Sequence, residues 1–113
     1  MKQILNGVIK NTILGEEDHG IFTAMLMIDM GGLGGGFGGY ALDRYDEDAK
    51  TRVGTEYGMQ FIKEVLKTLR VSKWEDLKGT YLRVEIDGTR IVRIGHVMEN
   101  RWFDPEDIGR RFR

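Results

Sequence analysis

Cysteine is absent from this chain of 113 residues, and proline occurs only once. Without cysteine the chain cannot form disulfide bonds, thiolate metal ligands or a cysteine nucleophile, and this composition is typical of a reducing compartment. A single proline excludes a proline-rich linker. A chain of this length is long enough for one modest hydrophobic core, so we predict one domain over residues 1–113.

The chain also lacks an excess of either charge and any long apolar run. Lys and Arg number 17 against 18 Asp and Glu, which gives a net charge of -1 and no global attraction to a nucleic-acid backbone. The longest apolar stretch, Ile21 to Met30, is interrupted by Thr23 and Asp29 and is too short to span a membrane. Residues 1–14 contain no continuous apolar segment of the kind found in secretory signals. We therefore expect a cytoplasmic protein without a membrane partner.

Glycine, in contrast, is abundant, and seven of the nine residues from 31 to 39 are glycine. Because glycine loses more backbone entropy on folding than any other residue, so dense a run indicates positive φ angles or a close approach of the backbone to something else. Two interpretations stay open, a ligand site and a connecting or packing segment. The first would use consecutive N–H groups as an anion-binding nest, and its candidate residues are Gly34, Gly36, Gly38 and Gly39.

The same glycines match G-x-G-x-x-G only formally. A dinucleotide-binding fingerprint opens a helix, whereas the residues that follow this run, 40–42, are typical of a strand. No Gly-Lys-Ser/Thr sequence follows either, which excludes a P-loop.

Hydrophobic periodicity predicts an α+β fold in the order β-β-β-α-β-β. It comprises a single antiparallel sheet of about five strands, with one main amphipathic helix packed on one face. Thr55 is the expected N-cap of the helix. The expected strands are 3–14, 21–29, 37–42, 81–86 and 89–98, and the expected helix is 55–69, with Ile62 and Val65 in its core-facing stripe. The dipeptide Asp87-Gly88 predicts a tight hairpin turn between the last two strands.

Both faces of the strand at 21–29 are mostly apolar, so we expect it to be covered on both sides. Surplus methionines, such as Met25, Met27, Met30 and Met59, predict that the protein forms a homo-oligomer. Residues 43–50 are acidic and are expected to form a loop.

Several side chains could contact a ligand. Phe37, Tyr40 and Trp102 could stack on a planar base, although aromatic residues beside strands are more often part of the core. Asp43 and His96 could fix the polar edges of the ligand; the alternatives are a solvated acidic loop and a hydrogen-bonded histidine of the sheet. The spacing of the acidic residues lacks a calcium-binding frame, so no metal or cofactor is expected. The arginines of the C-terminal segment, Arg110, Arg111 and Arg113, are expected in a solvated tail, and the alternative is that they contact phosphate or an acidic partner.

Four segments together resemble a group of small bacteriophage and prophage proteins of uncharacterised function. They are Gly36-Phe37-Gly38-Gly39-Tyr40-Ala41-Leu42-Asp43, Trp74-Glu75-Asp76-Leu77-Lys78-Gly79, Ile94-Gly95-His96 and Trp102-Phe103-Asp104-Pro105. The resemblance implies an origin in a phage or mobile element, and hence an accessory protein that counters host defence. It implies no catalytic residues.

We therefore expect a non-enzymatic protein that binds a host defence protein, as anti-CRISPR proteins do, or sequesters a small phosphorylated nucleotide. One alternative is a single-stranded nucleic-acid-binding protein of phage replication, which the near-zero net charge disfavours. A small metal-dependent hydrolase that uses His96 with Asp43 is a further alternative, and a structural virion component also stays open.

Overall fold

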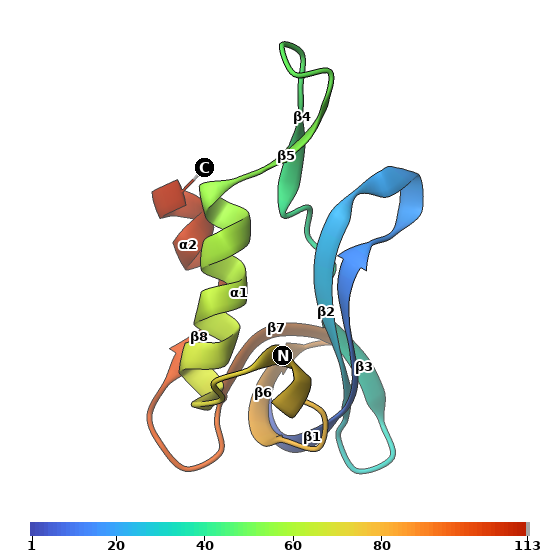
Figure 1. Cartoon of the computed structure of the whole chain (residues 1–113). Helices are drawn as coiled ribbons and strands as arrows, with labels where there is room; N and C mark the ends of the chain where they lie inside the picture. Colours follow the sequence, from blue (N-terminus) through green and yellow to red (C-terminus); the bar gives the residue numbers. More distant parts are fainter. Residues whose placement is uncertain (113) are drawn as a thin grey trace.

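A computed structural model describes residues 1–112 and shows the predicted mixed α+β architecture (Figure 1). One main sheet contains six antiparallel strands, a second sheet contains two, and two helices complete the fold. The strands are β1 (Lys2–Glu16), β2 (Phe22–Asp29), β3 (Gly34–Gly38), β4 (Asp43–Asp46), β5 (Thr51–Gly54), β6 (Tyr81–Asp87), β7 (Arg90–His96) and β8 (Trp102–Phe103). The helices are α1 (Glu56–Leu69) and α2 (Pro105–Phe112), and two short 3-10 turns lie at Asp18–Gly20 and Trp74–Asp76.

The main sheet has the order β3-β2-β1-β6-β7-β8 and curls strongly (Figure 1). The long strand β1 makes the curl, because its first half pairs with β6 and its second half with β2, with a register shift between Ile9 and Asn11. A bulge of this kind bends a strand and increases its twist. As a result β3 and β7 approach each other, and a Cβ built on Gly35 would lie 3.1 Å from Cδ1 of Ile91.

Helix α1 supplies much of the core, and its start follows the predicted capping chemistry. The Thr55 hydroxyl accepts a hydrogen bond from the N–H of Gly58 at 2.9 Å and donates one to the carbonyl of Leu42 at 2.9 Å. Val65 is buried as predicted, together with Phe61 and Leu69, whereas Ile62 is only half-buried at the edge of the buried stripe. The predicted hairpin is also confirmed, since β6 and β7 pair across the turn at Gly88.

Three predictions about the middle of the chain are wrong. The expected strand 37–42 is displaced, because the glycine run itself forms β3 and residues 39–42 are irregular. Strand β2 is fully covered on one face only: Ala24, Leu26 and Ile28 are buried there, whereas on the other face Thr23 is buried and Met25 and Met27 are partly exposed. The expected acidic loop begins with strand β4, which pairs with β5.

Strands β4 and β5 form a hairpin, residues 43–54, that projects from the body of the molecule (Figure 1). We call this hairpin the arm. The expected C-terminal tail is instead helix α2, which packs against α1, and Arg113 lies outside the described residues. Among the described residues, neither helix is long and apolar enough to cross a membrane.

Candidate functional site

The glycine run forms a hairpin with β2. Met30 donates its N–H to the carbonyl of Leu33 at 2.7 Å, and the two residues between them, Gly31 and Gly32, have φ angles of 73° and 94°. This turn needs positive φ at both central positions, which glycine adopts without steric cost. The first part of the run is therefore explained by a tight turn.

Packing explains part of the rest of the run. Gly38 has a φ of 109°, and a Cβ at this position would lie 2.4 Å from the carbonyl oxygen of Ala24. Gly34, Gly36 and Gly39 are exposed, and a Cβ on Gly36 would meet only the flexible Met25 side chain at 3.4 Å. Thus Gly38 is required by the close approach of two strands, whereas Gly34 and Gly36 lie on an accessible surface.

Phe37 does not reach that surface. It is 2 % exposed and packs against Phe61 and Phe103, with ring centroids 6.1 and 5.9 Å away. The prediction that Phe37 stacks on a ligand is wrong, because its ring fills the space between the curled sheet and α1.

Tyr40, directly after the glycine run, lines a hollow of about 440 Å³ between the body and α2. We call this hollow the Tyr40 pocket; its lining residues are Tyr40, Tyr57, Arg90, Pro105, Glu106, Gly109 and Arg110. The Tyr40 ring is half-buried and lies 5.9 Å from the ring of Phe61, so the core fixes one side of it. Helix α2 forms one wall of this open pocket, and its buried residues Pro105 and Ile108 hold it against the body.

Two arginines, Arg90 and Arg110, and one carboxylate, Glu106, line the Tyr40 pocket. Arg90 is exposed, and a hydrogen bond from its guanidinium to the Tyr40 hydroxyl is the main reason that the pKa of Arg90 is raised above its ordinary value. The negative charges of Glu106 and Asp104 also contribute to the raised pKa of Arg90. Within residues 1–112, no carboxylate forms an ion pair with Arg90 at 4 Å or less. Arg110 pairs with Asp107 one turn earlier in α2. Arg90 is therefore a fixed positive charge available to a ligand.

Asp43 lies elsewhere, at the base of the arm. Its carboxylate accepts hydrogen bonds from Arg52 at 2.8 and 2.9 Å and from the N–H of Phe22 at 3.2 Å. The hydrogen bond from the Arg52 side chain is the main reason that the pKa of Asp43 lies below its ordinary value. Both acceptor oxygens are used, so the structure gives Asp43 a role in anchoring the arm.

This ion pair predicts a pH dependence of stability. Because the pKa of Asp43 is lower in the folded than in the unfolded state, its contribution is present above the unfolded value and is lost as the pH falls through the folded value. The free energy of unfolding of Asp43→Asn should therefore lie below that of the wild type at pH 7 and converge with it in acid. Urea denaturation at a series of pH values measures this difference, and a difference that does not change with pH would contradict the assignment.

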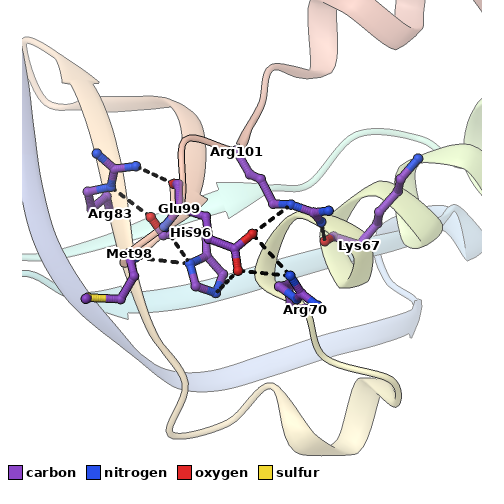
Figure 2. Close-up of polar contacts among 7 residues, drawn as sticks. All are labelled: Lys67, Arg70, Arg83, His96, Met98, Glu99 and Arg101. Carbon is purple, nitrogen blue, oxygen red and sulfur yellow. Dashed lines mark hydrogen bonds and ion pairs between the residues drawn. The ribbon is translucent and has the colours of Figure 1, made fainter.

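His96 ends β7 in a polar network that holds residues 97–101 against the C-terminal end of α1 (Figure 2). Its Nδ1 accepts hydrogen bonds from the N–H groups of Met98 and Glu99, both at 3.0 Å. The Glu99 carboxylate pairs with Arg70 at 3.0 Å and with Arg101 at 3.2 Å. His96 is thus a hydrogen-bonded residue of the sheet, and the structure does not place it beside Asp43.

The ring of Trp102 is also engaged in contacts within the protein. The guanidinium carbons of Arg83 and Arg93 lie 4.7 and 4.3 Å from the centroid of its ring. A Cβ on Gly95 would lie 2.7 Å from the same ring, so β7 presses directly against it. The ring is therefore held by cation–π contacts and by packing on the outer face of the sheet.

The structure places only Tyr40, among the predicted side chains, in the Tyr40 pocket. Asp43, His96 and Trp102 lie in three other places, each with partners of its own. The sequence pattern marks Arg90 only as part of an ordinary hairpin, and it favours a solvated tail for Arg110 over contact with phosphate. The position of Arg90 just after a tight turn is a signal in the sequence, but no comparable signal points to Arg110.

Comparisons with known proteins give no further guide to this site: no family model, no curated protein and no solved structure matches the chain.

Proposed function

We propose that this protein is a non-enzymatic binding protein that captures a small phosphorylated nucleotide in the Tyr40 pocket. The observation that carries this proposal is the convergence of Arg90 and Arg110 with the Tyr40 ring around one hollow of about 440 Å³. That volume falls within the range usual for small-molecule sites.

The chemistry of the lining suits both halves of a nucleotide. A guanidinium presents a planar fork of N–H donors that matches phosphate oxygens, and Arg90 has no competing carboxylate within ion-pair distance among the described residues. When a nucleotide binds, the side chain of Arg110 would leave its ion pair with Asp107 and pair with the phosphate instead. The Tyr40 ring, fixed on one side by Phe61, offers a face on which a base can stack.

The lining also favours binding over turnover. Among the described residues that line the pocket, Glu106 is the one carboxylate, and serine, cysteine and histidine are not represented. Nucleophilic catalysis needs a nucleophile within hydrogen-bonding reach of a base, and serine, cysteine and histidine are the usual members of such pairs. The setting that we propose, a phage protein that sequesters a host signal, rests on the sequence resemblance alone.

We expect Arg90→Gln to weaken nucleotide binding at least tenfold without changing the melting temperature by more than a few degrees. The loss follows because hydrogen bonds to charged groups contribute about 1.5–3 kcal/mol, and 1.4 kcal/mol is a factor of ten in affinity. Isothermal titration calorimetry with ADP and a cyclic dinucleotide as probes measures the change.

Arg44→Gln is the matched control, since Arg44 is an exposed arginine of the arm. It removes the same charge from a place outside the Tyr40 pocket and should leave the affinity unchanged. If both variants weaken binding equally, net charge rather than the pocket is responsible, and the proposed site is wrong.

Single-stranded nucleic-acid binding remains a second candidate because one topological observation favours it. Strands β3, β2, β1, β6 and β7 form a partly closed barrel in which β3 approaches β7, and α1 lies between β3 and β6 in the chain. Small Greek-key barrels of the OB-fold type bind oligonucleotides on such a sheet. Fold-level likeness is weak evidence for function, and a steep fall of affinity with salt would be needed to support this candidate.

A further inference from the structure

We propose that the arm and the groove beneath it form a reciprocal interface between two copies of this chain. The groove has a volume of about 750 Å³ and lies between the arm, the adjoining ends of β1 and β2, and the first turns of α1. Its apolar lining residues are Phe22, Leu42, Val53, Met59 and Ile62, together with the ring of Tyr45. This groove is separate from the Tyr40 pocket.

The first argument is that the arm has no core of its own. It is a single two-stranded hairpin, and its residues are all exposed or half-buried. An isolated two-stranded hairpin is at best marginally stable in water. Nevertheless its base is firmly anchored by the Asp43–Arg52 pair, and its turn by hydrogen bonds from two N–H groups to Asp46. The arm is thus held in a defined shape although it has no hydrophobic core of its own. Such a projecting element is suited to contact another molecule.

The second argument is the apolar surface around the groove. Met59 is 60 % exposed and Tyr45 is 50 % exposed, while Phe22, Val53 and Ile62 beside them are half-buried. Contiguous exposed apolar groups of this kind mark interaction sites more often than scattered ones do. Methionine is also a residue that adapts to a partner's shape.

The third argument identifies the occupant as a second copy, because the charges of the chain are self-complementary. The tip of the arm carries charges of both signs, the exposed Glu47 and Asp48 and the exposed Lys50, and none of the described residues forms an ion pair with any of the three at 4 Å or less. The exposed Glu16, which lines the groove, offers a partner for Lys50 of a second copy. Lys63 lies one turn after Met59 on α1, is exposed, and likewise has no such ion pair within residues 1–112. Four residues of strand reach about 13 Å, enough for a tip to pass along a neighbour's groove.

Two-fold symmetry completes this argument. An isologous interface places each copy's protruding element in the matching recess of the other, so that one contact geometry is used twice. Here the arm and the groove adjoin in one chain, because residues of the arm and of the first turns of α1 line the groove. The segment after β5 leads from the arm into α1 (Figure 1). Two copies would therefore cover both arms and both grooves at once.

Sedimentation velocity over a concentration series tests this proposal. We expect the wild type to be a dimer at low micromolar concentration and Met59→Asp to raise the dissociation constant at least tenfold. Because Met59 is exposed in the single chain, the circular dichroism spectrum of Met59→Asp should match that of the wild type. Met98→Asp is the matched control, as Met98 is 84 % exposed and lies in the loop after β7.

A second variant tests the charge argument separately. Glu47→Lys together with Asp48→Lys should weaken the dimer, and adding Lys63→Glu should restore part of the affinity. A wild type that stays monomeric at 100 µM would overturn the proposal. So would a dimer that Met59→Asp leaves intact, because the interface would then lie elsewhere.

Discussion

Gly38→Ala should destabilise the fold severely, whereas Gly36→Ala should have little effect. At Gly38 a Cβ would lie 2.4 Å from the backbone oxygen of Ala24, and the φ angle of 109° is one that residues with a side chain rarely adopt. Backbone strain and overpacking together would cost on the order of 3 kcal/mol or more, a large part of the stability of a small domain. Urea denaturation monitored by circular dichroism measures the loss.

Gly36→Ala is a control from the same strand. Its Cβ would meet only the Met25 side chain, which can move aside. Equal stability losses in the two variants would contradict this account of β3, because they would show that the glycines are required for a common reason rather than for a contact at one position.

Val65→Asp should leave the protein unfolded at 25 °C. Val65 is fully buried between α1 and the curled sheet, and an aspartate there would have no cationic partner. An unpaired buried charge costs several kcal/mol, and the cavity left by valine adds to the loss. We expect a circular dichroism spectrum without the α1 signal and without a cooperative melt.

Ile62→Asp gives the comparison with the sequence-based prediction, which placed both residues in the core. Ile62 is half-buried at the edge of the groove, so water can reach an aspartate at this position. This variant should fold with reduced stability. A cooperative melt of Val65→Asp near the wild-type temperature would show that α1 packs differently.

The elements predicted from the sequence are those whose signals are local. Helix α1 repeats apolar residues at helical spacing after a capping Thr55, and Asp87-Gly88 specifies the β6–β7 turn by its backbone preferences. Helix α2 had a local signal too, because Asp104 caps it through the N–H of Glu106 at 2.9 Å and Pro105 occupies its first turn. The arginines of this segment, which are typical of a solvated tail, obscure that signal.

Strand β3 and the arm could not be predicted in this way. Glycine has little intrinsic preference for a strand, so β3 forms because β2 supplies the pairing partner and Phe37 its only core side chain. The acidic residues of the arm are typical of a loop, and they form a hairpin because Asp43 pairs with Arg52 nine residues later.

In the candidate site, too, the residue with a local signal was predictable from the sequence and the residues brought together by the fold were not. Tyr40, the aromatic residue directly after the glycine run, was a candidate from the sequence, and the structure shows that it lines a pocket; its contact with a ligand stays a prediction. Its cationic partners, Arg90 and Arg110, are 50 and 70 residues away in the chain, and only the curl of the sheet and the docking of α2 bring them together. Residue spacing carries no information about such contacts.

Native mass spectrometry of the protein, mixed with a small-molecule extract of bacteria and then desalted, tests the central claim most directly. We predict a retained mass that fragments into a nucleobase and phosphate, at one ligand per chain, and its loss in Arg90→Gln but not in Arg44→Gln. A wild-type protein that retains nothing from the extract and binds no nucleotide at millimolar concentration would contradict the claim. The search would then turn to a protein target, by capture from a host lysate.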